Sequence, residues 1–350
     1  MSPSWADVLT GLVAAHDLTA EQASWAMNEI LTGEATSAQI AGFLVALQAK
    51  GPTAAEIGGL ITGMLDQARP IELHATDAVD IVGTGGDRAN TVNVSTMAAM
   101  VAAAAGAAVI KHGNRAASSA CGTADCLEAL GVVLDLAPHR QPEVFEATGI
   151  VFLFAALYHP SLRHAAVPRR ELGIRTPFNV LGPLANPARP AAAALGVADA
   201  ATATLMADVL AARGTRGVVF HGADGLDELT TTSASQVWLV VDGQVHPTRL
   251  DPQDLGIPRA APADLVGGDP RHNAQIVRDT FGGTPGPVRD IVILNAAAAL
   301  LAAAGPDPSL SLTDQFVPQV ERAAAAIDSG AAASLLTRWV EITSQIAARG

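Results

Sequence analysis

The sequence contains little cysteine, and this excludes two common kinds of stabilising site. Only two cysteines, Cys121 and Cys126, occur in 350 residues. Two thiols in a chain of this length do not make a disulfide framework, so the composition favours a reducing compartment. Their spacing offers no further ligands to complete a tetrahedral zinc site. We therefore expect both cysteines to be small packing residues.

The chain also lacks the features of a membrane-spanning or exported protein. The longest apolar run that we recognise, Met97–Ile110, is rich in alanine and shorter than the roughly 20 residues that a bilayer requires. The N-terminus has no basic stretch followed by an apolar core, so no secretory signal is predicted. We expect a cytoplasmic protein without a membrane partner.

Positive charge is scarce. The chain has 21 lysines and arginines against 34 aspartates and glutamates, a formal net charge of −13. General nucleic-acid binding depends on a basic surface, so no nucleic-acid partner is expected. An acidic protein that binds a polyphosphate must neutralise it locally, with backbone N–H groups, a few placed cations or a divalent metal.

The first 70 residues predict a small helical module. A threonine followed three residues later by Gln or Glu is a capping box, and such boxes begin at Thr19, Thr36 and Thr53. The helix after Thr36 carries an apolar stripe and is expected to stop at Gly51-Pro52.

After Pro70, short apolar runs alternate with helical segments, which indicates a mainly parallel sheet covered on both faces. The Asp242-Gly243 pair between two alternating runs predicts one antiparallel hairpin. Alanine-rich stretches at residues 98–108, 191–194 and 296–304 are expected to be helical. The expected strands are residues 78–82, 107–111, 132–134, 150–154, 217–221, 236–241, 244–250 and 291–294.

A glycine-rich turn followed by a polar helix start predicts a phosphate site. The first predicted strand runs into GTGGD, residues 83–87, and a helix begins near Ser95. Glycines let the backbone approach a phosphate, and the helix start adds N–H groups and a positive dipole end. A plain turn is the alternative. The spacing matches neither a Walker A loop nor the dinucleotide fingerprint, so a dinucleotide-dependent oxidoreductase is the weakest alternative.

A second loop, KHGNR at residues 111–115, follows the next predicted strand. Ligands of doubly wound sheets bind beyond the carboxyl ends of strands, so both loops can face one pocket. Lys111 and Arg115 supply charge for phosphates, while His112 and Asn114 offer neutral donors and acceptors. A solvated basic loop is the alternative, but the concentration of charge in an acidic chain favours binding.

Two later segments suggest a carboxylate partner and a metal site. Arg169 stands in RRELGIRT, and an arginine fork suits a planar carboxylate, although such a helix is as often a surface face with local ion pairs. Asp227 and Glu228 follow a strand-end glycine turn. Adjacent carboxylates there suit Mg²⁺, and an acidic surface turn is the alternative.

These segments together resemble the anthranilate phosphoribosyltransferases. The motifs are GTGGD, KHGNR with LEALG (residues 127–131), RRELGIRT with FNVLGPLANP (178–187), and DGLDE (224–228). The resemblance covers nearly the whole chain. It implies transfer of phosphoribose from phosphoribosyl pyrophosphate to the amine of anthranilate in tryptophan biosynthesis, with Mg²⁺ as the cofactor.

The resemblance also implies an α/β fold of the nucleoside phosphorylase and phosphoribosyltransferase kind. A helical domain would cover residues 1–71, joined by helices from about 165–190, and an α/β domain with a mainly parallel central sheet would cover 72–350. A homodimer would form through the helical domains. The remaining alternatives are a pyrimidine nucleoside phosphorylase and a non-catalytic nucleic-acid-binding relative.

Individual residue roles follow from the same resemblance, with no covalent nucleophile. Phosphoribosyl pyrophosphate would be held by Gly83, Gly85, Gly86, Asp87, Thr91, Asn93, Ser95, Thr96, Lys111 and Ser119. Anthranilate would contact Gly83, His112, Asn114, His159 and Arg169. Mg²⁺ would be bound by Ser95, Asp227 and Glu228.

Overall fold

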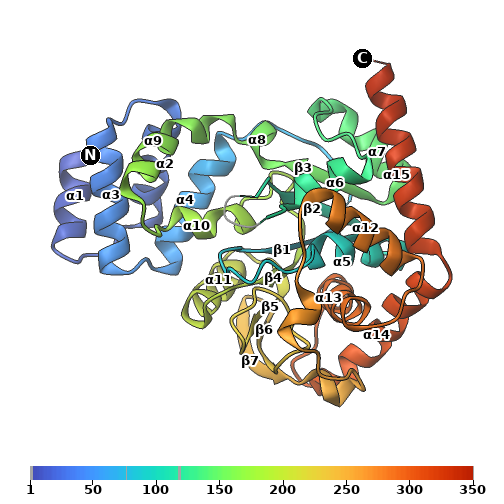
Figure 1. The fold of residues 1–350 in the computed structure, drawn as a ribbon. Helices are drawn as coiled ribbons and strands as arrows, with labels where there is room; N and C mark the ends of the chain where they lie inside the picture. The colour runs from blue at the N-terminus through green and yellow to red at the C-terminus, as the bar shows by residue number, and fades with distance from the viewer. Residues whose placement is uncertain (1–2, 76, 117–119, 350) are drawn as a thin grey trace. The chain divides into compact units, whose positions relative to one another are not determined.

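The computed structural model describes residues 3–75, 77–116 and 120–349. The chain forms two compact units. The helical unit comprises Met1–Pro70 and Ala155–Pro187, and the α/β unit comprises Ile71–Phe154 and Ala188–Gly350. Figure 1 labels the elements of both units.

The helical unit begins with four helices whose starts the sequence marks. They are α1 (Trp5–Val13), α2 (Ala20–Thr32), α3 (Ser37–Lys50) and α4 (Ala54–Asp66), followed after the chain returns by α8 (Ala155–Tyr158), α9 (Arg163–Leu172) and α10 (Phe178–Leu181). All three predicted capping boxes are confirmed, at the starts of α2, α3 and α4.

Two glycines let α4 pack closely on α2. A Cβ atom at Gly59 would lie 2.2 Å from the carbonyl oxygen of Ala20, and one at Gly63 would lie 2.7 Å from that of Ser24. The two helix backbones therefore approach more closely than side chains would permit.

The α/β unit is built on a seven-stranded sheet in the order β3-β2-β1-β4-β5-β6-β7. The first five strands in chain order pair in parallel, and the last two form an antiparallel hairpin, as the sequence predicts. The strands are β1 (Val79–Gly83), β2 (Val109–Gly113), β3 (Ile150–Phe154), β4 (Ala192–Gly196), β5 (Arg216–Gly222), β6 (Ser235–Val241) and β7 (Gln244–Leu250).

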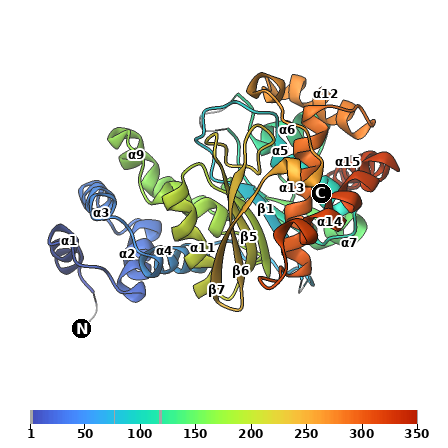
Figure 2. The same cartoon turned by 90° about the horizontal axis from the view of Figure 1, so that it is seen from below.

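Helices cover both faces of this sheet. Figure 2 shows α11 on one side of the strands and α13 and α14 on the other. The buried faces of α5 and α13 are rich in alanine, so these helices pack closely on each other and on the sheet. The helices of the unit are α5 (Val94–Ala104), α6 (Thr123–Leu130), α7 (Gln141–Thr148), α11 (Ala200–Ala212), α12 (Pro270–Phe281), α13 (Pro287–Ala304), α14 (Leu312–Asp328) and α15 (Ala331–Ala348).

Three sequence expectations about elements are wrong. Residues 191–194 were expected to be helical, but residues 192–196 form β4, which is buried throughout between β1 and β5. Residues 291–294 are one part of the long helix α13 rather than a strand. Residues 132–134 form no strand, and the N–H of Val133 donates to the Thr343 hydroxyl instead of to a sheet neighbour.

Helix α13 also corrects the expectation about apolar runs. Within the described residues it is the one helix long and apolar enough to cross a membrane, judged by length and composition alone. Of its residues, 67% are buried inside the protein, and the helix packs against β1, β4 and β5. Its apolar surface therefore belongs to the core.

A buried carboxylate ties the helices of the helical unit together. Glu56 is fully buried and accepts hydrogen bonds from the backbone N–H groups of Leu18 and Thr53, each over 2.8 Å. It also pairs with the Lys50 ammonium over 2.9 Å, and Lys50 reaches the exposed Asp17. The loop before α2, the end of α3 and the start of α4 therefore meet at one charge.

We predict that Glu56→Ala destabilises the protein by about 3–5 kcal/mol, because it leaves a buried ammonium and buried N–H groups without their acceptor. Urea unfolding followed by circular dichroism measures this. Asp17→Ala, which removes the exposed partner of the same lysine, is the control and is expected to cost about 1 kcal/mol or less. Equal losses in the two variants would contradict this account of Glu56.

Candidate phosphate and metal site

The carboxyl ends of β1 and β4 close directly on Asp227, which follows β5. A Cβ atom at Gly83 would lie 2.1 Å from the Asp227 Oδ2, and one at Gly196 would lie 1.7 Å from the Asp227 carbonyl oxygen. Neither strand end has room for a side chain. Asp227 is therefore held between two strands whose last residues must be glycine.

The same carboxylate holds the start of the phosphate loop, residues 84–93. The N–H of Gly85 donates to the Asp227 Oδ2 over 2.7 Å. Gly85 and Gly86 have φ values of +68° and +84°, the left-handed region that favours glycine. The glycines of GTGGD are thus required both for space and for backbone conformation.

Glu228 faces the start of α5, which follows the phosphate loop. The nearby Ser95 N–H, in the first turn of α5, acts to lower the pKa of this acid, against the larger effect of burial. The N-cap residue of α5, Asn93, makes no capping hydrogen bond with its side chain. A carboxylate distant in sequence therefore lies near the helix start, where the positive dipole end favours negative charge.

Three carboxylates crowd the site. Burial raises the pKa of Asp227 to about 6, and the nearby Asp87 raises it further in the same direction. Burial, and then the charge of Asp227, raises the pKa of Glu228 well above its usual value. The charged forms of both acids are thus disfavoured, and a bound cation would offset this.

Lys111 supplies a positive charge beneath the loop. Its side chain is buried, and its ammonium donates to the Ile81 carbonyl and, over 3.3 Å, to the Ser95 hydroxyl. Burial lowers its pKa, while the charges of Asp80, Glu228 and Asp227 act in the opposite direction. Because one ammonium group faces several carboxylates, the remaining negative charge of the site favours the binding of a further cation.

The donor set fits Mg²⁺ rather than a metal held wholly by protein. Within the described ranges, no group of three or more His, Cys, Asp or Glu side chains is arranged to hold a metal ion. Mg²⁺ is commonly bound by one or two carboxylates together with waters and substrate phosphates. Asp227 and Glu228 can supply those carboxylates. The Ser95 hydroxyl, which accepts a hydrogen bond from Lys111, is a further oxygen that could contact the ion.

The remaining predicted residues of the phosphate loop and of α5 lie beside this site. Asp87 and Thr91 are half-buried, and Thr91 forms an isolated bridge with Val266. Thr96 is buried, and its hydroxyl has no hydrogen-bond partner within the described protein. Ser119 lies outside the described residues.

The loop after β2 separates into buried and exposed parts. His112 is buried, and its N–H donates to Asp80 over 3.2 Å, whereas Asn114 is exposed. Arg115 does not serve as a spare cation, because it pairs with Glu128 over 2.7 Å and with Asp125 over 3.3 Å. The expected role of Arg115 in neutralising phosphate is therefore not supported.

His159 and Arg169 belong to the helical unit. The Nε2 of His159 contacts the Ala185 carbonyl over 2.9 Å, and burial lowers the pKa of this histidine. The Arg169 guanidinium stands over the Phe178 ring, 5.5 Å from its centre, and burial lowers its pKa. Arg169 is thus a partly desolvated cation, while its neighbour Arg170 is exposed.

Two buried asparagines that no sequence motif marks form hydrogen bonds with residues of the site. Asn295 in α13 accepts the Leu229 N–H over 3.0 Å and donates to the Leu229 carbonyl over 2.8 Å, directly after the acid pair. Asn273 in α12 contacts Asn93. Neither stands in a recognisable local pattern, so only the fold could reveal them.

Comparison with known proteins decides the family. The description "Glycosyl transferase family, helical bundle domain" matches residues 6–68, and "Glycosyl transferase family, a/b domain" matches residues 75–333. The anthranilate phosphoribosyltransferase of Thermobifida fusca (strain YX) is 58% identical, covering 97% of this chain and 96% of that one. The chain belongs to the anthranilate phosphoribosyltransferase family. The resemblance seen in the sequence motifs is confirmed.

Solved structures of this family agree. The anthranilate phosphoribosyltransferase of Thermus thermophilus matches with a TM-score of 0.90 and 41% identity, covering 97% of this chain and 99% of that one. The enzyme of Saccharomyces cerevisiae, in complex with phosphoribosyl pyrophosphate and Mg, matches with a TM-score of 0.88 and 26% identity over 97% and 98% of the two chains.

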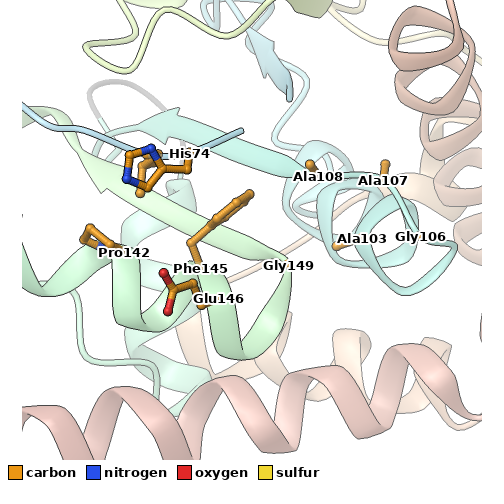
Figure 3. A pocket seen from close by; sticks show the side chains of 10 residues that line it. His74, Ala103, Gly106, Ala107, Ala108, Pro142, Phe145, Glu146 and Gly149 are labelled. Atoms are coloured by element: carbon orange, nitrogen blue, oxygen red, sulfur yellow. The ribbon is translucent and has the colours of Figure 1, made fainter. Parts of the chain in front are cut away.

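A cavity of about 420 Å³ lies at the opposite end of the strands from this site. Figure 3 shows His74, Phe145 and Glu146 among the side chains that line it. Ala108 directly precedes β2 and Gly149 directly precedes β3, so the cavity borders the amino ends of the strands. It takes no part in the site.

We predict that Gly83→Ala weakens binding of phosphoribosyl pyrophosphate at least tenfold, because the new methyl group displaces the Asp227 carboxylate, and overpacking of this kind costs about 1–3 kcal/mol. Isothermal titration calorimetry with Mg²⁺ measures this affinity. Gly58→Ala, at a helical glycine with open space around it, is the control and should leave the affinity unchanged. Full affinity in Gly83→Ala would contradict the geometry described here.

Proposed function

We propose that this protein transfers phosphoribose from phosphoribosyl pyrophosphate to the amine of anthranilate, giving N-(5-phosphoribosyl)anthranilate and pyrophosphate, in tryptophan biosynthesis. Its family supports this, as do the complexes of the yeast relative with phosphoribosyl pyrophosphate and Mg and with 4-fluoroanthranilate. The observation that carries the proposal is the buried acid pair Asp227 and Glu228, in which Asp227 holds the start of the glycine-rich phosphate loop and Glu228 lies near the first turn of α5.

The residues divide by the part of the reaction that they serve. The phosphate loop, the first turn of α5 and Lys111 would bind phosphoribosyl pyrophosphate through backbone N–H groups, hydroxyls and one ammonium. Asp227 and Glu228, with the Ser95 hydroxyl, would hold Mg²⁺. When bound, Mg²⁺ stabilises negative charge on the departing pyrophosphate.

The nucleophile needs little activation. The amine of anthranilate is a weak base and is neutral near pH 7, so no strong general base is required. The difficult step is the loss of pyrophosphate from the ribose carbon through an oxocarbenium-like state. Holding two substrates aligned can lower the barrier by roughly 7–11 kcal/mol. We therefore propose no covalent enzyme intermediate.

Anthranilate requires a partner for its carboxylate and contacts along its ring. We propose Arg169 as that partner, since a partly desolvated guanidinium binds a carboxylate strongly. His112, Asn114, His159 and the backbone at Gly83 are the proposed further contacts.

Two alternatives are disfavoured by the acid pair and by the charge. A pyrimidine nucleoside phosphorylase binds free phosphate and has no need for Asp227 and Glu228 as metal ligands. A nucleic-acid-binding relative would require a basic surface, whereas the net charge is −13.

We further propose a cytoplasmic homodimer that joins through the helical units, which carry exposed apolar residues such as Val13 and Val45.

We predict that the proposed activity lowers anthranilate fluorescence only when protein, phosphoribosyl pyrophosphate and Mg²⁺ are all present. Omission of each component in turn is the control. Phosphorolysis of thymidine or uridine is measured in parallel. No loss of anthranilate under any metal, together with phosphorolysis, would replace the proposed function by the phosphorylase.

We predict that Arg169→Ala raises the KM for anthranilate roughly 10- to 100-fold, because a hydrogen bond to a charged group contributes about 1.5–3 kcal/mol. The KM for phosphoribosyl pyrophosphate should change less than the KM for anthranilate. Arg170→Ala removes an exposed arginine from the next position and is the matched control, expected to be near wild type. Equal effects of the two variants would exclude Arg169 as the carboxylate partner.

A further inference from the structure

A hydrogen-bond chain reaches Asn93 from α12. The Nδ2 of Asn273 donates to the Oδ1 of Asn93 over 2.8 Å. The Nδ2 of Asn93 donates in turn to the carbonyl of Cys121 over 3.2 Å. The Asn93 amide therefore has a protein partner at each end, and turning it over would place donor against donor and acceptor against acceptor.

Asn273 is itself held in one orientation. Its Oδ1 accepts the N–H of Gly268 over 2.7 Å, and the residue is only 2% exposed. Because the oxygen faces Gly268, the amide nitrogen must face Asn93. The direction of the chain is thus fixed from Gly268 through Asn273 to Asn93.

The backbone before α12 follows the phosphate loop closely. The N–H of Val92 donates to the Leu265 carbonyl over 2.9 Å, and the N–H of Gly267 donates to the Asn90 carbonyl over 2.8 Å. A Cβ atom at Gly267 would lie 2.8 Å from the Asn273 Oδ1. The glycine leaves the space through which Asn273 reaches the loop.

Helix capping does not account for Asn273. The N-cap of α12 is Asp269, whose side chain accepts the His272 N–H over 2.9 Å. Asn273 stands within the helix, on the buried side, where asparagine is a poor helix former and an apolar residue would pack without polar partners. Its amide contacts Gly268 in the loop before α12, Asn93 in the phosphate loop and the Cys121 side chain.

We infer that Asn273 is a positioning residue for phosphoribosyl pyrophosphate. By holding the Asn93 amide in one rotamer, it presents the remaining donor and acceptor capacity of Asn93, which is half-buried, in one direction. This inference rests on the proposed function, in which Asn93 contacts that substrate.

The variant Asn273→Asp separates the contact with Gly268 from the contact with Asn93. An aspartate keeps an oxygen for the Gly268 N–H and removes the amide that donates to Asn93. Its second oxygen then faces the Asn93 Oδ1 and turns that amide away. The Kd for phosphoribosyl pyrophosphate, measured by calorimetry with Mg²⁺ and without anthranilate, is expected to rise about tenfold. Its KM should rise in parallel, with kcat and the KM for anthranilate within about twofold of wild type.

Asp269→Ala is the matched control, because it removes the cap of the same helix and leaves the chain to Asn93 intact. It should lower the melting temperature without changing the Kd. Gly267→Ala is a second test variant, whose new methyl group would lie 2.8 Å from the Asn273 Oδ1 and, less closely, 3.1 Å from the Thr91 carbonyl oxygen, and it should reproduce the weaker binding. It keeps the inference testable if Asn273→Asp does not fold.

An unchanged Kd in folded Asn273→Asp or in Gly267→Ala would overturn the inference, as would an equal rise in Asp269→Ala. Wild-type protein that binds phosphoribosyl pyrophosphate but does not consume anthranilate would refute the proposed acceptor and leave the Asn273 comparison decisive. Wild-type protein that does not bind phosphoribosyl pyrophosphate would overturn both.

Discussion

The contact between Asp227 and the glycine ends of β1 and β4 is the constraint on which the site depends. The carboxylate occupies the volume that a side chain at Gly83 would fill, and its oxygen accepts the N–H of Gly85. Glu228, the next residue, lies near the first turn of α5. Two adjacent acids thereby shape a loop that is distant from them in sequence, and the same acids are the proposed metal ligands.

The arrangement is electrostatically incomplete without a cation. Asp227, Glu228 and Asp87 repel one another in a buried place, and Lys111 offsets only part of that repulsion. The surrounding backbone is fixed and opposes this repulsion. Asn295 forms two hydrogen bonds with Leu229, the residue after Glu228, and α13, which carries Asn295, packs in the core. Rigidity supplied by the core thus maintains a charge arrangement that Mg²⁺ and a polyphosphate complete.

Local patterns in the sequence predicted much of this. Capping boxes located three helices, the Asp-Gly pair located the hairpin, and the glycine-rich run indicated the loop after β1. The wrong expectations have one cause: residues 191–194, 291–294 and 132–134 are short apolar runs, and packing against the rest of the fold decides whether such a run is helix, strand or loop. Long-range contacts could not be predicted from local patterns either: the hydrogen bond from Gly85 to Asp227 and the one from Asn273 to Asn93 each join segments more than 100 residues apart.

The most direct test of the central claim is whether the acid pair holds the metal. Mn²⁺ can stand in for Mg²⁺, and water-proton relaxation reports Mn²⁺ bound to the slowly tumbling protein. With phosphoribosyl pyrophosphate present, the account predicts bound Mn²⁺ in the wild type and in Asp242→Asn, which alters an acid in the hairpin turn. It predicts loss of that Mn²⁺ in the double variant Asp227→Asn with Glu228→Gln. Equal binding in the folded double variant would contradict the account.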